Sequence, residues 1–399
     1  MCATVFLEPL DVLLLRGNKL FGDPGSYGEA LVPPWPSLAA GALRSRMLVD
    51  DGVDLAAFAR GEIEHAELGT PAKPGPFAIA AFHLARRFAD GRVELLFQPP
   101  ADLVITEDDE GKPCVNRLRP IVSVPGLASS SPFTHLAVLP ETKRSKPTSG
   151  YWLSEFGWRK YLAGKPVAGE DLVKSNALWQ LDHRVGVGLD AATRRASDGR
   201  LFSVQAVAMV KRGHRIRPNC GEHNPTLADY DVGFVAAVTG ATPPSNGMVR
   251  LGGDGRAAAL HKADVGLPEP DYEAIVEARR CRLALTTSGI FADGWLPTGC
   301  TRLEEGSFRF ELAGVRARLV CAAVPRFEVV SGWDLAQWQP KPALRAAPAG
   351  TVYWLDELQA TPEALRKLAR HGLWSEPCED AARRAEGFNN ALPAAWPQT

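Results

Sequence analysis

The sequence FLEPLDVLLLRGNKLFGDPGSYGEALVPPWPSLAAGALRSR, residues 6–46, decides how the chain folds. It opens with an apolar run over residues 5–15 that predicts a strand, continues through a glycine-rich loop and reaches a proline elbow at residues 33–36. Pro36 fixes its own backbone and biases the preceding residue towards an extended conformation, so the elbow is expected to be rigid. A helix is predicted to begin at Ser37, whose hydroxyl can cap the first turn. The free amides of that turn also form a ready site for an anion such as phosphate.

Composition indicates a globular protein with a real core and without a global basic character. The 399 residues are 45% hydrophobic and 23% charged, and this length predicts two or three domains. The 37 glycines and 32 prolines favour loops and short strands over long helices. Because the net charge is −1, any nucleic-acid site has to be a local patch of basic residues.

Cysteine usage and hydropathy predict a cytoplasmic protein. The seven cysteines are scattered and form no Cys-x-x-Cys pair, which is typical of reduced thiols. The N-terminal residues do not have the pattern of a signal peptide, and no run is apolar over the roughly 18 residues that a membrane helix needs. We therefore expect no membrane partner.

Strands and helices alternate along the whole chain, which predicts an α+β fold. Alternating or continuous apolar runs predict strands at residues 77–87, 92–97, 202–210, 232–238, 281–287, 308–312, 315–324, 327–330 and 352–355. Helical spacing predicts helices at residues 151–162, at 271–279 and after Thr361, with Ser154 and Thr361 as caps. The mixture favours two α+β sandwiches, with an extended insertion at residues 120–147 in the first.

Basic residues gather in three stretches. Residues 194–200 place three arginines on an exposed turn where packing does not require them, although a solvated basic hairpin explains them equally well. Residues 211–217, KRGHRIR, form the strongest basic run and suit phosphate contact. Residues 249–256, VRLGGDGR, bring arginines to both ends of a glycine loop that lacks the spacing of a P-loop or a dinucleotide fingerprint.

Four stretches of the sequence carry a family resemblance. The pattern P-x-x-P-S-L-x-x-G-A-L-R at residues 33–44 resembles the loop–helix signature of the RAMP superfamily of CRISPR systems. The opening L-E-P-L-D-V-L-L-L-R-G at residues 7–17 is similar to the third subunits of type III-B (Cmr) RNA-guided interference complexes. The frame R-V-G-V-G-L-D-x-x-T-x-x-A-x-x-G-x-L-F at residues 184–202 and the G-G-D-G-R element at residues 252–256 are similar to the same family.

The resemblance implies two ferredoxin-like (RRM-like) domains with β-hairpin and loop insertions, expected at residues 1–225 and 226–399. It implies a non-catalytic subunit that holds the 5′ handle of the guide CRISPR RNA, with no cofactor and no metal. The implied protein partners are the large polymerase-like subunit and the backbone RAMP subunits. In RAMP proteins the loop of a two-strand unit like residues 184–202 lies near RNA.

We expect RNA contacts from basic side chains through phosphates and sugars, and from Trp35 through stacking on a base. The predicted contacts are Trp35, Arg44, His183, Arg184, Arg194, Arg195, Arg200, Lys211, Arg212, His214, Arg215, Arg250 and Arg256. Near the C-terminus, residues 386–392 take the place of the family's glycine-rich loop, with Asn389 and Asn390 where small residues are expected. Asparagine tolerates positive backbone angles, so a tight turn there is still expected.

Two other functions stay open at this level. Some RAMP relatives cleave RNA with a histidine as general base, and His183 beside Arg184 is the best candidate for such an endoribonuclease of CRISPR repeat RNA. His214, Cys220 and His223 suggest a metal-dependent hydrolase, although no fourth ligand follows at the usual spacing.

Overall fold

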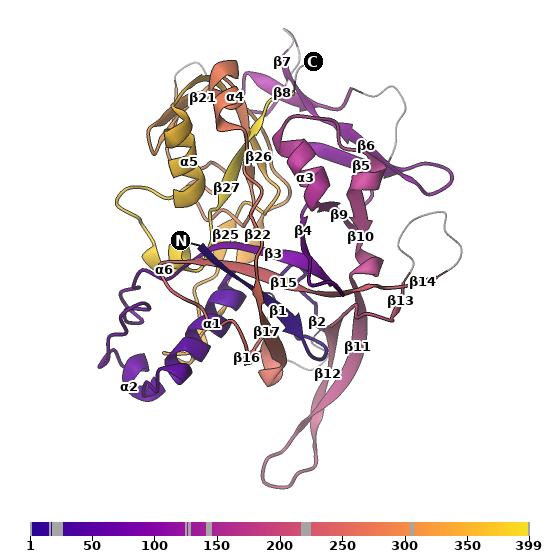
Figure 1. Ribbon diagram of the computed structural model, residues 1–399, viewed down its shortest axis with the longest axis vertical. Coiled ribbons are helices and arrows are strands. Elements are labelled where there is room, and N and C mark those ends of the chain that lie inside the picture. The colour runs from indigo at the N-terminus through magenta and orange to yellow at the C-terminus, as the bar shows by residue number, and fades with distance from the viewer. Residues whose placement is uncertain are drawn as a thin grey trace.

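The computed structural model describes residues 2–15, 17, 27–123, 126, 129–140, 146–216, 225–303 and 307–397. Short helices and mainly antiparallel sheets build the described chain, so the expected α+β class is confirmed (Figure 1). None of the described helices is long and apolar enough to cross a membrane.

The first sheet has eight strands in the order β10-β9-β4-β3-β15-β1-β17-β16. Its strands are β1 (Cys2–Pro9), β3 (Ala78–Phe88), β4 (Val93–Phe97), β9 (Tyr151–Ser154), β10 (Leu172–Lys174), β15 (Tyr230–Thr239), β16 (Met248–Arg250) and β17 (Ala257–Ala263). Successive side chains of a strand point to opposite faces, so Val5 and Leu7 enter one core while Phe6 enters another. All the pairings within this sheet are antiparallel.

Helix α1 (Ser37–Asp50) covers one face of the first sheet, and the short helix α2 (Leu55–Ala59) follows it (Figure 1). The helix begins at Ser37 as expected, but the predicted serine cap is wrong. Pro36 already has helical dihedral angles and occupies the cap position, where no side chain accepts a hydrogen bond from the first turn. Ala40, Leu43 and Met47 lie at three- and four-residue spacing and are buried against the sheet.

An insertion follows β4 and forms its own layer beside the sheet (Figure 1). It contains β5 (Leu103–Glu107), β6 (Pro113–Arg117), β7 (Arg119–Val122), β8 (His135–Val138) and α3 (Glu155–Leu162), with the 3-10 turns η1 (Gly169–Asp171) and η2 (Ser175–Ala177) after it. The predicted cap at Ser154 is confirmed, since its hydroxyl accepts the amide of Gly157 at 3.1 Å. Residues 151–154, which we expected to be helical, form β9 instead.

The second sheet has six strands in the order β19-β20-β21-β26-β18-β27. They are β18 (Cys281–Leu285), β19 (Cys300–Arg302), β20 (Phe308–Leu312), β21 (Val315–Ala323), β26 (Val352–Gln359) and β27 (Ala391–Ala395). Helices α4 (Tyr272–Ala278) and α5 (Pro362–His371) pack on one face of it. The predicted hairpin over residues 313–314 and the predicted cap at Thr361 are both present.

The first sheet extends beyond the boundary expected between residues 225 and 226. Strands β15, β16 and β17 follow that position in the sequence, yet β15 and β17 flank β1 on its two sides. Pairing with β1 therefore keeps residues 230–263 in the first sheet, and the second sheet begins with β18.

A shared apolar core joins the two sheets and the insertion. Phe6 and Val235 from the first sheet meet Trp158 of α3 and Trp354 of β26 in this core. Within it lies a fully buried ion pair, in which Arg282 Nη1 of β18 is 2.6 Å from Asp102 Oδ2 of the insertion. The same carboxylate accepts the Tyr161 hydroxyl at 2.9 Å. Because both charges are buried, removing either one would leave the other without a counter-ion and would destabilise the fold.

A long hairpin, β11 (Trp179–Leu189) with β12 (Ala196–Met209), projects away from the body (Figure 1). The short strand β2 (Tyr27–Gly28) pairs in parallel with β12, and β13 (Arg215–Ile216) pairs with β14 (Thr226–Leu227) nearby. The turn η3 (Gly253–Gly255) lies between β16 and β17, and the small elements of the C-terminal part are β22 (Glu328–Val330), β23 (Trp333–Asp334), β24 (Gln339–Pro340), β25 (Leu344–Ala346) and α6 (Ala381–Ala385).

Candidate nucleic-acid interface

The projecting hairpin presents most of its basic side chains to solvent. Arg194, Arg195 and Arg200 are all exposed at its outer end. Within the described part of the chain none of these three guanidinium groups has an ion-pair partner. Asp190 shapes the turn by accepting the amides of Ala192 and Thr193, at 3.1 and 2.7 Å. The backbone of Arg194 has a φ of 55°, so the turn holds that residue in the left-handed region.

Glycines let the hairpin strands twist closely around each other. A Cβ at Gly186 would lie 2.5 Å from the Phe202 ring, and one at Gly188 would lie 2.9 Å from the Arg200 side chain. One face of the hairpin also carries exposed apolar side chains. They are Leu181, Val185, Val187, Leu189 and Leu201. The outer hairpin therefore combines free guanidinium groups with apolar contact area.

The predicted general base, His183, stands alone on this hairpin. It is exposed and lies opposite Gln205 in the strand pairing. Its neighbour Arg184 is paired with Asp182 at 2.8 Å, with both side chains about 40% exposed (41% and 44%). No carboxylate of the described residues forms an ion pair with His183, so the strand offers no group that would orient its imidazole as a base.

At the base of the hairpin the basic residues are already paired. Lys211 Nζ lies 2.9 Å from Glu8 Oε1, and Arg212 Nε lies 2.8 Å from Asp231 Oδ2. Glu8 also pairs with Arg87 at 2.6 Å and contacts His261 Nε2 at 2.9 Å. We call Glu8, Arg87, Lys211 and His261 the Glu8 cluster.

The pKa of Glu8 lies below its usual value. Burial by itself would raise this pKa, but the hydrogen bond and charge of Lys211 and the charges of Arg87 and His261 outweigh burial. Glu8 therefore stays ionised at neutral pH and holds these cations on the sheet. Of the remaining residues in the basic run, His214 and Arg215 are exposed, and Arg217 lies outside the described residues.

The glycine loop at residues 252–256 is partly engaged with the rest of the protein, although Asp254 and Gly255 at its tip are exposed. The amide of Gly253 donates to the carbonyl of Leu14 at 2.9 Å, so it is already used. Arg256 Nη1 pairs with Asp11 at 2.6 Å. Arg250, at the other end of the loop, is exposed.

Two predicted RNA contacts, Trp35 and Arg44, lie away from the hairpin, and the indole ring of Trp35 is buried within the protein. Trp35 is 9% exposed, packs with Trp374 and Phe388, and directs its indole N–H to Glu328 at 3.3 Å. Arg44 lies over the Phe77 ring at 5.0 Å, and burial lowers its pKa. The hydrophobic pocket around the elbow comes from residues 290–388, which local sequence patterns cannot reveal.

The C-terminal loop forms the tight turn that was expected. Asn389 has a φ of 61°, and its side chain is fully buried. Its amide group bonds to both backbone groups of Ile290, at 2.6 and 3.1 Å. The loop therefore packs inside the protein.

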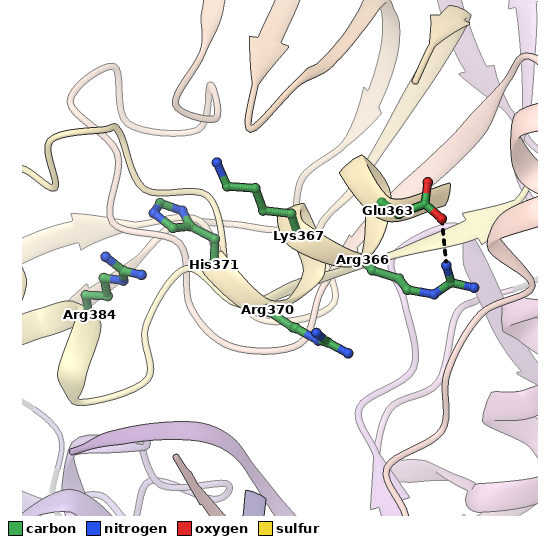
Figure 2. A pocket seen from close by; sticks show the side chains of 6 residues that line it. All are labelled: Glu363, Arg366, Lys367, Arg370, His371 and Arg384. Carbon is green, nitrogen blue, oxygen red and sulfur yellow. Dashed lines mark ion pairs between the residues drawn. The ribbon is translucent and has the colours of Figure 1, made fainter. Parts of the chain in front are cut away.

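A basic hollow on helices α5 and α6 was missed by sequence reasoning. Figure 2 shows Lys367, His371 and Arg384 around it, with Arg370 on the adjacent side of α5. Lys367 and His371 share Glu376, at 3.1 and 3.5 Å. The signal in the sequence is the three- and four-residue spacing of basic residues in 366–371, but cations near a helix C-terminus also stabilise the helix itself.

The metal hypothesis falls largely outside the described residues. Cys220 and His223 are not among them, and His214 is exposed, with its ring Nδ1 accepting the amide of Lys211 at 3.2 Å. No group of three or more His, Cys, Asp or Glu side chains placed to hold a metal ion occurs in the parts of the chain that the structure describes.

Comparison with known proteins gives a family. Two solved structures are similar, described as "Cryo-EM structure of the Type III-B Cmr-beta bound to cognate target RNA and AMPPnP, state 1" and "Cryo-EM structure of the Type III-B Cmr-beta bound to cognate target RNA". Each is 13% identical, with a TM-score of 0.42 over 88% of this chain and 86% of that chain. A search of the curated proteins found no match. The family described as CRISPR-associated protein (Cas_Cmr3) matches residues 5–396. Because this match spans nearly the whole chain, the protein belongs to the Cas_Cmr3 family of CRISPR-associated proteins.

Proposed function

We propose that this chain is the third subunit of a type III-B CRISPR effector complex, a RAMP protein that holds the 5′ handle of the guide RNA without cutting it. Family membership supports the complex, and the projecting hairpin carries the proposed contact with RNA. Its three exposed arginines have no ion-pair partner among the described residues, so phosphates can approach them without displacing a carboxylate. In this role the chain docks the large polymerase-like subunit and the first backbone subunit in the cytoplasm, for antiviral defence.

Strand order supports two ferredoxin-like units. In the first sheet the strands β3-β15-β1-β17 follow the sequence order 2-3-1-4, and in the second sheet β21-β26-β18-β27 follow the same order. A ferredoxin-like unit has this strand order with two helices. The first unit keeps the helix after its first strand, α1, and the second keeps the helix after its third strand, α5.

Single-stranded RNA suits the hairpin for a physical reason. Proteins bind it through cations along the backbone together with contacts to unstacked bases, and the hairpin offers guanidinium groups beside exposed apolar side chains. A binding role without cleavage agrees with the setting of His183, which lacks an orienting carboxylate among the described residues.

The direct test is to purify the chain from its native host by an affinity tag and to sequence any RNA that accompanies it. We expect guide RNAs with one uniform 5′ end, together with the other subunits of the complex. A parallel incubation with repeat RNA in the absence of metal should leave the RNA intact. Recovery of the chain without RNA, or cleavage that His183→Ala abolishes, would reject the proposal.

A further inference from the structure

A small hairpin in the C-terminal part exposes two tryptophans. Strands β23 and β24 form the tip of residues 331–342, which we call the Trp hairpin. Trp333 is 47% exposed, Leu335 61% and Trp338 73%. The two indole rings meet edge to face, with centroids 6.0 Å apart. Water contact with so much apolar area is unfavourable, so a cluster of this kind indicates an interaction site.

Buried charges hold both ends of the Trp hairpin. Arg383, only 5% exposed, donates to the carbonyls of Ser331 and Pro342 at 3.2 and 3.4 Å. Glu386, 4% exposed, binds the ammonium group of Lys341 and pairs with Arg383 at 3.1 Å. Burying charged groups is costly unless they are paired. Here the paired charges fix the position of an exposed apolar tip, which is how a pre-organised binding element is built.

The chemistry of the tip favours a protein partner over RNA. Between Gly332 and Pro340 the only charged residue is Asp334, and its carboxylate accepts the amides of Ala336 and Gln337 at 2.9 and 3.1 Å. Lys341, just beyond, is held by Glu386. Sites for single-stranded nucleic acid combine aromatic rings with cations along the backbone, and this tip offers no free cation. An uncharged apolar centre with tryptophans is instead typical of the core of a protein interface.

We infer that the Trp hairpin is a docking element that inserts Trp333, Leu335 and Trp338 into an apolar pocket of a neighbouring protein subunit. The inference rests on the proposed function, because it takes the neighbour to be a protein subunit of the same effector complex. It adds a protein contact that is separate from the arginines of the β11–β12 hairpin.

The test uses the complete complex, purified through a tag on a different subunit. The amount of the double variant Trp333→Ser/Trp338→Ser recovered with the complex should be at least about tenfold lower than that of the wild type, since tryptophans in interface pockets are typical hot spots. Leu335→Asp, which adds a charge to the same surface, should have the same effect. In the wild type, hydroxyl-radical oxidation of Trp333 and Trp338 should fall when the chain enters the complex.

Phe156→Ser is the matched control, because Phe156 is 64% exposed on α3 and distant in sequence. It should leave complex assembly unchanged, and all variants should keep the melting temperature and the RNA affinity of the isolated chain. If both hairpin variants remain in the complex as well as the wild type does, the inference is overturned. It is also overturned if the two indoles of the wild type stay reactive in the complex. Loss of RNA affinity with intact assembly also overturns it, since the indoles would then bind bases. If the wild-type chain itself joins no complex, the proposed function fails first.

Discussion

The outer end of the β11–β12 hairpin and its base differ in what their basic residues do. At the outer end, Arg194, Arg195 and Arg200 are exposed and have no ion-pair partner in the described chain. At the base, Lys211 and Arg212 pair with carboxylates of β1 and β15. The residues are similar and lie within twenty positions of each other, but the paired cations hold strands together and the open ones remain available to a ligand.

This difference shows that a basic run in a sequence does not by itself mark a binding surface. A phosphate that approached Lys211 would compete with a carboxylate 2.9 Å away, whereas one that approached Arg195 would displace only water. Substitutions at paired and at unpaired charges therefore test this contrast, and the fully buried pair of Asp102 and Arg282 should respond most strongly.

Removing the carboxylate of Asp102 should have the largest effect. Asp102→Leu leaves the Arg282 guanidinium fully buried without a counter-ion and the Tyr161 hydroxyl without its acceptor. We expect the free energy of unfolding to fall by about 3–5 kcal/mol, measured by urea denaturation. The double variant Asp102→Leu/Arg282→Met should recover much of this loss, because it buries no lone charge.

The exposed pair of Glu110 and Lys112 provides the control for Asp102. These side chains are 73% and 62% exposed, so Glu110→Gln should change the free energy of unfolding by less than about 1 kcal/mol. A loss of similar size in Asp102→Leu and Glu110→Gln would contradict the role given to the buried pair.

Neutralising the outer hairpin should weaken RNA binding without affecting stability. For Arg194→Gln/Arg195→Gln/Arg200→Gln we expect the affinity for single-stranded guide RNA to fall about 10- to 100-fold at low salt. The slope of log K against log salt should decrease by about 2, since each phosphate contact to a single strand contributes about 0.7. Fluorescence anisotropy over a salt series measures both quantities.

The paired residue Lys211 provides the comparison for that triple variant. Lys211→Gln should leave the salt slope nearly unchanged, because its ammonium group is bound to Glu8 in the free protein. An equal loss of slope in Lys211→Gln and in the hairpin variant would remove the distinction between the two regions.

The Glu8 cluster should make stability depend on pH at the acid end. The folded protein holds the pKa of Glu8 below the 4.5 of an ordinary glutamate. The stabilisation is therefore complete above about pH 4.5 and is lost as the pH falls through the lower, folded value. Glu8→Gln should reduce the free energy of unfolding by about 1–2 kcal/mol at pH 7, and by less at pH 3.5. A variant that loses equal stability at both pH values would argue against the ion pairs.

His183→Ala should have the smallest effect. An exposed imidazole can supply at most one hydrogen bond to RNA, so the affinity should change by no more than about fivefold. The variant and the wild type should both leave RNA uncut in a metal-free incubation, as followed on a denaturing gel. Cleavage by the wild type alone would place His183 in a catalytic site.

Local features could be predicted from the sequence, and long-range partners could not. The caps at Ser154 and Thr361, the turn after Leu312 and the positive φ of Asn389 each depend on a few neighbouring residues. The burial of Trp35 was missed because most of the residues that cover it, such as Ile290, Trp374 and Phe388, follow more than 250 positions later. The pairing of Glu8 with Lys211 spans 203 positions, so the sequence alone did not show that Lys211 in the basic run is already bound to a carboxylate.

The shared core of the two sheets has a consequence for synthesis on the ribosome. One face of the first sheet, including Phe6 and Val235, is covered by Val320 and Trp354 of the second sheet. A nascent chain that has emerged only to residue 263 therefore lacks the part of this cover that the second sheet supplies, and that part of the apolar face stays exposed to water until translation supplies the rest. Such a half-made product is prone to aggregate, so a chaperone that shields that face should raise the yield of the complete protein.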